Sequence, residues 1–309
     1  MVFMRFWSVR RLCARRVRAK KCANCLVCEV LTALLHALNP IGVFDSGIGG
    51  LSVLREIRRE LPGENLIYVA DSAHAPYGDK PQEFIEARAF AITRFLLGSS
   101  AKAIVVACNT ATGAAVSALR CHFTLPIVAM EPAIKPAAAQ TKTGVIGVLA
   151  TSRTLASPNF VKLFARYGVD VEILVQACTG LVEQVEAGDL SGAKTLGLVE
   201  SYVLPLVARG ADTLVLGCTH YPFLSPLIQQ VAGPDVAVID SSEAVARQLR
   251  RRLEVHDLLT DAVDSGSEQF WTSADPAKTE AIIRELWNPE IKVGRLSESG
   301  NLQAIQSSA

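Results

Sequence analysis

The chain lacks three features that would place it outside the ordinary globular proteins. No apolar run reaches about eighteen residues, so no membrane-spanning helix is expected. Eight cysteines among 309 residues are too sparse for a disulfide scaffold. A formal net charge of +1 gives no overall attraction to nucleic acid or to a membrane surface. We therefore expect no nucleic-acid or membrane partner, and a reduced, cytoplasmic setting.

Half of the residues are hydrophobic, which in a chain of this length is enough to bury a sizeable core. This composition excludes a disordered tail and a small stapled scaffold. It fits two domains or one large α/β unit.

The basic residues are concentrated at the start, where residues 1–40 hold eight Lys or Arg against the single acidic Glu29. An export signal is one interpretation, but Glu29 interrupts the apolar run and no clear cleavage site follows. Cys22, Cys25 and Cys28 are spaced like metal ligands but have no fourth partner nearby, so no metal site is expected. We expect residues 1–40 to be a poorly ordered or dispensable basic extension, or the product of a reading frame started too early.

After the extension, apolar runs alternate with longer helical patterns, which is typical of βαβ units and a mostly parallel sheet. Strands are expected near residues 41–44, 66–69, 103–107, 126–129, 145–149, 171–175, 213–217, 236–239 and 269–272. Helices are expected near residues 50–60, 81–97, 112–120, 131–140, 156–167, 180–186, 193–209, 223–231, 242–253 and 276–287.

The ends of the expected strands repeat along the chain. Residues 41–43 and 146–148 both read Ile-Gly-Val, at an offset of 105 residues. The segments AIVVACNT and TLVLGCTH place Cys108 and Cys218 at strand ends, at an offset of 110 residues. We therefore predict two similar doubly wound α/β half-domains with mostly parallel sheets and an active site in the cleft between them.

Two breaks in the pattern predict where the chain crosses between the halves. One lies at Glu131-Pro132 and the other at the polar stretch that starts at Asp240. The predicted first domain is 41–131 plus 241–295, the second is 132–240, and 296–309 form a loose tail.

Polar side chains follow the expected strands directly. Because ligands bind outside the carboxyl ends of the strands in open parallel sheets, these positions are the candidates for chemistry. They are Asp45-Ser46, Asp71-Ser72, Cys108-Asn109-Thr110, Thr151-Ser152 and Cys218-Thr219-His220.

The segment DSGIGG places Gly47, Gly49 and Gly50 after the first strand. The spacing is not G-x-G-x-x-G, so no nicotinamide or flavin cofactor is expected. One interpretation is that the glycines let the backbone approach a small ligand, with helix N–H groups aimed at an anion such as a carboxylate. The alternative is a tight turn in which Asp45 is only an N-cap.

A single cysteine is usually a small core residue, but two at matching strand ends indicate a functional pair. A thiol just before a helix faces N–H groups, and we expect these to stabilise the thiolate and lower its pKa. His220 and Asp45 could assist Cys218 and Cys108 from opposite sides. Two acid–base groups from similar halves suit racemisation, in which one group removes a proton and the other returns one to the opposite face.

The remaining candidates have no such repeated setting. We expect Cys121 and Cys178 to be structural, and we assign no role to His122 and His256. His74 follows the second strand and is expected to line the site.

Five ordered segments, IGVFDSGIGGLSVLREI, YVADSAHAPYGDK, VVACNTATGAAV, GVLATSRT and LGCTHYPFL, resemble the motifs of the glutamate racemase family, and FWTSADP resembles its later segment. The resemblance covers about residues 41–290. It implies a cofactor-independent isomerase that interconverts L- and D-glutamate and supplies D-glutamate for peptidoglycan, and hence for cell-wall biogenesis and cell shape. A homodimer is left open.

The resemblance also implies residue roles. Cys108 would handle the proton of D-glutamate, with Asp45 assisting, and Cys218 that of L-glutamate, with His220 and a glutamate assisting. The implied substrate contacts are Asp45, Ser46, Tyr77, Gly78, Asn109, Thr110, Ser152, Thr219 and His220.

The assisting glutamate is left between two residues, because ACTGLVEQVEAG departs from the proline-containing segment more usual in the family. Glu186 is favoured over Glu183 because the ending of the segment fits better. Two other functions stay open: a racemase of the same superfamily acting on aspartate or hydantoins, and a non-catalytic dicarboxylate-binding protein.

Overall fold

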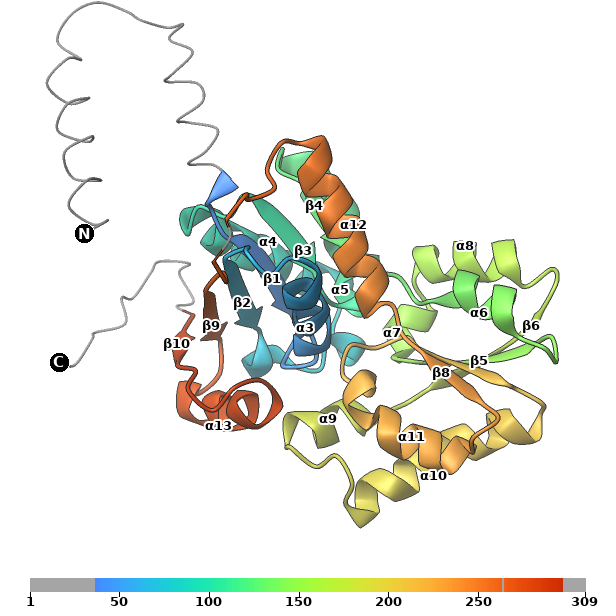
Figure 1. The fold of residues 1–309 in the computed structure, drawn as a ribbon. Helices are drawn as coiled ribbons and strands as arrows, with labels where there is room; N and C mark the ends of the chain where they lie inside the picture. The colour runs from blue at the N-terminus through green and yellow to red at the C-terminus, as the bar shows by residue number, and fades with distance from the viewer. Residues whose placement is uncertain (1–36, 263, 297–309) are drawn as a thin grey trace, which may run out of the picture. The chain divides into compact units, whose positions relative to one another are not determined.

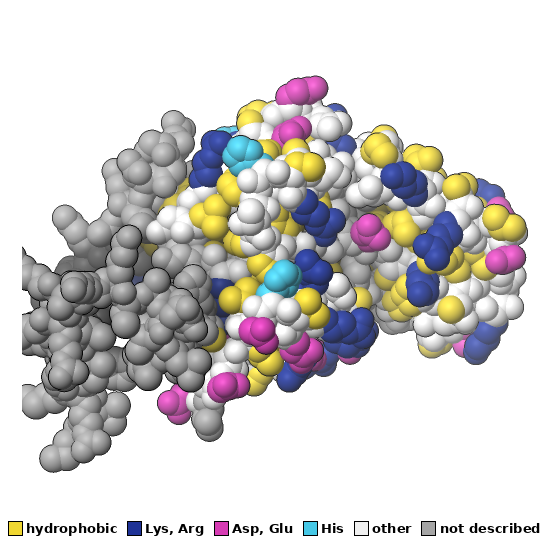
Figure 2. All heavy atoms as spheres, turned by 90° about the horizontal axis from the view of Figure 1, so that it is seen from above, with side chains coloured by type: hydrophobic (Ala, Val, Ile, Leu, Met, Phe, Trp, Pro, Cys, Tyr) yellow, Lys and Arg dark blue, Asp and Glu magenta, His cyan; other side chains and the backbone are white. Residues whose placement is uncertain are grey.

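The computed structural model describes residues 37–262 and 264–296. The C-x-x-C-x-x-C segment, nearly all of the expected basic extension and most of the expected tail lie outside these residues. Within the described ranges, no helix is both long enough and apolar enough to cross a membrane. The face of the molecule seen in Figure 2 carries basic, acidic and apolar side chains side by side.

The first half of the fold is a six-stranded sheet in the order β10-β9-β2-β1-β3-β4, with every neighbouring pair parallel. Its strands are β1 (Ile41–Asp45), β2 (Leu66–Ala70), β3 (Ala103–Val106), β4 (Ile127–Ala129), β9 (Glu268–Thr272) and β10 (Val293–Arg295). Figure 1 shows helices on both faces of this sheet. They are α4 (Gln82–Gly98) and α5 (Asn109–His122) on one face, and α3 (Leu51–Glu60) and α12 (Ser242–Val255) on the other.

Smaller elements complete this half. Helix α13 (Pro276–Leu286) lies against β9 and β10. Two single-turn 3-10 helices, η1 (Ser72–His74) and η2 (Tyr77–Asp79), follow β2 at the carboxyl edge of the sheet.

The second half is a four-stranded parallel sheet in the order β6-β5-β7-β8. Its strands are β5 (Val145–Ala150), β6 (Glu172–Ala177), β7 (Thr213–Leu216) and β8 (Ala237–Ile239). Helices α6 (Ile134–Gln140) and α8 (Pro158–Tyr167) pack on one face, and α10 (Ala193–Ala208) and α11 (Ser225–Ala232) on the other. The short α7 (Ser152–Leu155), α9 (Leu181–Glu186) and η3 (Tyr221–Leu224) lie at strand ends.

Burial on both faces explains why the strands are nearly continuous apolar runs rather than alternating ones. All five residues of β1 are buried. Ile41 and Val43 belong to the core under α3 and α12, whereas Phe44 belongs to the core under α4 and α5. Each fully buried side chain of this size contributes roughly 1.5–3 kcal/mol. The apolar runs therefore fix the sheet, and only the residue at each strand's end is free to be polar.

The predicted fold class is confirmed: two similar α/β halves carry parallel sheets with helices on both faces. Three local features differ from the expectation. Helix α5 starts at Asn109 rather than near residue 112, because the Cys108 side chain caps it. Helix α7 is a separate turn that precedes α8. Strand β10 was not expected, since three residues carry too little pattern to be distinguished from a loop.

Candidate active site

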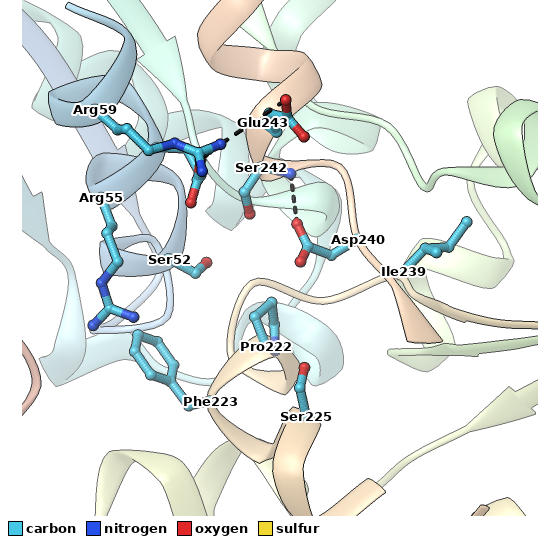
Figure 3. A pocket seen from close by; sticks show the side chains of 11 residues that line it. Ser52, Arg55, Arg59, Pro222, Phe223, Ser225, Ile239, Asp240, Ser242 and Glu243 are labelled. Carbon is cyan, nitrogen blue, oxygen red and sulfur yellow. Dashed lines mark hydrogen bonds and ion pairs between the residues drawn. The ribbon is translucent and has the colours of Figure 1, made fainter. Parts of the chain in front are cut away.

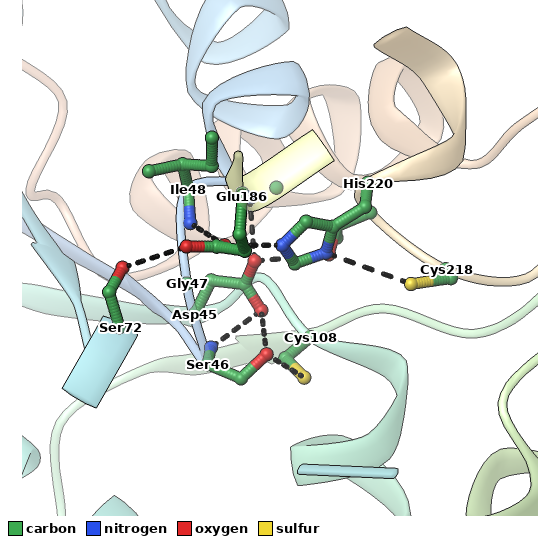
Figure 4. A network of polar contacts seen from close by, with 12 residues as sticks. Asp45, Ser46, Gly47, Ile48, Ser72, Cys108, Glu186, Cys218 and His220 are labelled. Atoms are coloured by element: carbon green, nitrogen blue, oxygen red, sulfur yellow. Dashed lines mark hydrogen bonds and ion pairs between the residues drawn. The ribbon is translucent and has the colours of Figure 1, made fainter. Parts of the chain in front are cut away.

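The two matched cysteines face one another across the two halves of the fold (Figure 4). Cys108 stands between β3 and α5, and Cys218 stands two residues after β7. Their exposed fractions are 4% and 8%, so both thiols are buried. A small cavity is lined by both of them, with Ser46, Pro76, Tyr77, Gly78, Asn109, Thr110, Thr151, Val182, Thr219 and His220.

Cys108 is connected to a carboxylate through a serine. Its Sγ accepts a hydrogen bond from the Ala111 N–H at 3.4 Å and donates to Ser46 Oγ at 3.7 Å. Ser46 Oγ in turn donates to Asp45 Oδ1 at 3.3 Å. Burial, together with the nearby charge of Asp45, raises the pKa of Cys108 well above its usual value. The expectation of a lowered pKa was wrong here, because a single helix N–H does not offset burial beside a carboxylate.

Asp45 is fully buried, and its carboxylate is held by backbone and side-chain donors. The N–H groups of Ser46 and Gly50 each donate to it at 2.7 Å. Thr219 Oγ1, from the other half, donates at 3.1 Å. Burial raises the pKa of Asp45, although the charge of His220 opposes the shift. The glycine turn therefore aims N–H groups at a carboxylate, as the sequence suggested, but the carboxylate belongs to the protein.

Cys218 lies beside a histidine–carboxylate pair. His220 Nδ1 is 3.8 Å from Cys218 Sγ, and His220 Nε2 is 2.6 Å from Glu186 Oε1. Burial lowers the pKa of His220, but its contacts with Cys218 and Glu186 more than offset this, so the pKa is raised well above its usual value. The imidazole is 1% exposed and can hold a proton between a thiol and a carboxylate.

The structure brings Glu186, and not Glu183, to His220. Besides His220, Glu186 accepts the Ile48 N–H at 2.7 Å through Oε1 and Ser72 Oγ at 3.1 Å through Oε2. Glu183 is exposed and lines a neighbouring depression instead. Glu186 is the last residue of α9, which explains why it projects beyond the second half toward the first.

Not all of the implied substrate contacts line the cavity. Asn109 and Thr110 line the cavity as α5 begins, and both polar side-chain atoms of Asn109 are buried without a partner in the described part of the chain. Ser152 is exposed and does not line the cavity, and Thr151 occupies that place. Thr110 Oγ1 and Thr151 Oγ1 are 3.0 Å apart, so the two halves meet there. At this strand end, Ser152 was the expected substrate contact, whereas Thr151 is the residue that lines the cavity.

Tyr77 lines the cavity, but its hydroxyl is already engaged. It donates to Asp71 Oδ2 at 2.5 Å, and Arg88 Nη2 and His74 Nδ1 lie 2.7 and 3.0 Å from Asp71 Oδ1. Burial raises the pKa of Asp71, but the hydrogen bonds and charge of Arg88 prevail, so the pKa is lowered. His74, expected to line the site, contacts this carboxylate and is not among the lining residues. Gly78 follows Tyr77 and packs on Thr151, where an added Cβ would lie 3.2 Å from Thr151 Cβ.

The other described cysteines stand outside the cavity. Cys121 is exposed on α5. Cys178 is buried directly after β6, so it does share the strand-end setting that it was expected to lack. Its Sγ donates to the Gln176 carbonyl at 3.5 Å, and burial raises its pKa. Within residues 37–262 and 264–296 no group of three or more His, Cys, Asp or Glu side chains could hold a metal ion.

A larger cavity of about 470 Å³ lies along α3 and is a different place (Figure 3). Arg55 and Arg59 from α3 face Phe223, Asp240 and Glu243 across it. Neither cysteine lines it. The candidate active site is therefore the smaller cavity between the thiols.

Comparison with known proteins agrees with this geometry. Residues 41–249 match the family model described as Asp/Glu/Hydantoin racemase. A glutamate racemase from Methylococcus capsulatus is 57% identical over 249 residues, which cover 81% of this chain and 92% of that protein.

Solved structures give the same result. A glutamate racemase from Bacillus anthracis superposes with a TM-score of 0.75 at 34% identity, covering 84% of this chain and 98% of that one. An Escherichia coli glutamate racemase, solved with L-glutamate and the activator UDP-MurNAc-ala, superposes with a TM-score of 0.74 at 34% identity, covering 83% and 97%. The chain thus belongs to the Asp/Glu/hydantoin racemase family and, within it, to the glutamate racemases.

Proposed function

We propose that this protein interconverts L- and D-glutamate by a two-thiol mechanism, and that its product is the D-glutamate required for peptidoglycan. One observation carries the proposal: two buried cysteines line one cavity from opposite halves, and each has its own acid–base partners. A binding protein has no use for two opposed thiols. A hydrolase that uses a Cys-His pair needs only one.

Conversion of L-glutamate begins at Cys218. Its thiolate takes the α-proton, the Cα–H bond breaks, and the electron pair stays on Cα, delocalised into the adjacent carboxylate. His220, held by Glu186, fixes the position of the Cys218 thiolate. The proton that Cys218 takes up can later pass to His220, which shares it with Glu186. Cys108 then gives its proton to the opposite face of Cα, so one C–H bond is broken and one is formed.

The raised pKa of Cys108 supports this order, because burial keeps it as a thiol, the form that donates a proton. In the reverse direction Cys108 must first lose its proton. Ser46 lies between Cys108 and Asp45, so the proton can pass through the serine hydroxyl to the carboxylate. The two directions then use two relays with different bases, a carboxylate at Cys108 and a histidine–glutamate pair at Cys218.

The substrate carboxylates need donors that the cavity provides at the strand ends. Asn109, with a buried amide that has no partner among the described residues, is the strongest candidate. Thr110, Thr151 and the N–H groups at the start of α5 stand beside it. In the glycine turn, the N–H groups of Ser46 and Gly50 are committed to Asp45 and that of Ile48 to Glu186, so these three donors are not offered to the substrate. We propose Thr151 rather than Ser152 as the substrate contact at that strand end.

The test is an assay of the full chain. Circular dichroism follows the loss of the ellipticity of L-glutamate, without added pyridoxal phosphate and with a metal chelator present. The proposal expects complete racemisation from either enantiomer. Turnover of L-aspartate or of a hydantoin in preference to glutamate would contradict the substrate, and glutamate binding without turnover would indicate a binding protein.

We also propose the domain division of 41–131 plus 241–295 and 132–240. The parallel pairing of β9 with β2 supports it, because the chain returns to the first sheet after α12. A cytoplasmic location is supported by the need for two free thiols. A homodimer stays a prediction that sedimentation velocity tests.

A further inference from the structure

The Glu186 carboxylate is held in a socket built by the first half of the fold, although Glu186 belongs to the second (Figure 4). The Ile48 N–H donates to Oε1, which also lies on His220 Nε2. Ser72 Oγ donates to Oε2. The side chain is 18% exposed, so these contacts are made largely out of water.

Gly47 forms the floor of this socket. A Cβ at residue 47 would overlap Glu186 Oε1 and lie 2.6 Å from Glu186 Cδ. Gly49 has the same relation to the histidine, because a Cβ there would lie 2.6 Å from His220 Cε1. The turn is therefore shaped to the carboxylate and the imidazole that serve Cys218.

Ser72 supplies the only side-chain donor to Glu186 Oε2 within the described ranges. It is the first residue of η1, the turn that follows Asp71. Without this hydroxyl, Oε2 would have no direct donor among the described residues, and the carboxylate could rotate away from the Ile48 N–H. His220 would then lose the partner that orients its ring toward Cys218.

We propose that Ser72 is a positioning residue for the Cys218 half of the reaction, acting through Glu186 and His220. The inference rests on the proposed function. It has a consequence for the fold: Glu186 and His220 of the second half are held by Ile48 and Ser72 of the first, so both halves contribute to the acid–base group that serves Cys218. The connection from Cys108 through Ser46 to Asp45 lies within the first half and does not depend on this socket.

The experiment measures primary isotope effects with glutamate deuterated at Cα. The equilibrium constant between enantiomers is one, so kcat/KM must remain equal in both directions and cannot reveal which half is impaired. The deuteron of each enantiomer is removed by one thiol only. Slowing one thiol therefore raises the isotope effect for its own enantiomer and lowers it for the other.

Ser72→Ala is expected to lower kcat/KM about tenfold, equivalent to one net hydrogen bond. It should raise the isotope effect for the same enantiomer as Glu186→Gln, and for the opposite enantiomer from Ser46→Ala. Ser72→Thr retains the hydroxyl and should restore most of the rate. Ser273→Ala is the matched control, because Ser273 Oγ accepts the Ala73 N–H of the same turn and does not touch Glu186.

Wild-type protein that does not racemise glutamate would refute the proposed function itself. With an active wild type, this inference is overturned by three results: isotope effects in Ser72→Ala that stay at wild-type values, effects that move together for both enantiomers, or effects matched by Ser273→Ala. A shift shared with Glu186→Gln and rescued by threonine supports it.

Discussion

Replacing Gly47 by alanine should impair catalysis while leaving the protein folded. The added Cβ would overlap the carboxylate of Glu186, which is the end of a flexible side chain and can swing aside. The backbone of Gly47 is not in the left-handed region, so alanine adds no strain there. Displacement breaks the hydrogen bonds of Glu186 with the Ile48 N–H and with His220, so we expect the free energy of unfolding to fall by about 1–3 kcal/mol, the net value of two hydrogen bonds.

The catalytic cost is larger because the displaced carboxylate leaves both the Ile48 N–H and His220. A positioned acid–base group contributes roughly 10²–10⁴-fold to a proton transfer. Since Cys218 and His220 themselves remain, we expect the lower end, a fall of about 10² in kcat/KM, or about 2.7 kcal/mol.

The assay pairs circular dichroism of glutamate racemisation with urea unfolding of the same preparation. Gly197→Ala is the control. Gly197 lies inside α10, and apart from its own helix backbone and chain neighbours no atom of the described residues lies within 4 Å of an added Cβ. Alanine should therefore stabilise by about 0.5–1 kcal/mol and leave the rate unchanged. Wild-type kcat/KM in Gly47→Ala would refute the reasoning. The reasoning would also be refuted if the urea data showed that the loss of rate comes from a loss of folded protein.

Three further predictions follow from the same contacts. Cys108→Ala should abolish racemisation but should still exchange the α-proton of L-glutamate for deuterium in deuterated water, which proton NMR detects. Exchange at D-glutamate instead would mean that the two thiols act on the opposite enantiomers from those assigned. Lys102→Met should lower the free energy of unfolding in urea by about 3 kcal/mol and leave kcat unchanged. The Glu64 carboxylate lies 2.5 Å from the Lys102 ammonium and is 2% exposed, so the substitution leaves it as an unpaired buried charge. Burial raises the pKa of Asp45, which must be ionised to accept a proton from Cys108, so kcat/KM should fall on the acid side at a pH above the ordinary carboxyl value of 3.8; an acid limb at or below that value would contradict the assignment.

Much of the fold was readable because buried parallel strands must be apolar on both faces. The apolar runs at 41–44 and 213–217 fixed their strands to within a residue, and the repeated cysteine context located the site at one edge. Strand β10 was missed because its three residues are defined by pairing with β9 rather than by any local pattern.

Within the site, the sequence predicted which groups gather but not how they are bonded. The glycine turn indicated an anion, yet nothing local could tell that Asp45 and Glu186 would be the anions bound. The pKa of Cys108 was predicted in the wrong direction, because burial by residues distant in sequence outweighs one helix N–H. Ser72 was noted only as a strand-end residue, since its partner Glu186 is 114 residues away.

The central claim is that two different thiols handle the two faces of Cα. The most direct measurement is racemisation of protiated L-glutamate in deuterated water, with the isotopic content of product and residual substrate determined by mass spectrometry at low conversion. We predict that the D-glutamate formed carries one solvent deuteron, while the remaining L-glutamate stays largely protiated. D-glutamate that keeps the original α-proton would mean that a single base removes and returns it, and would contradict the two-thiol mechanism.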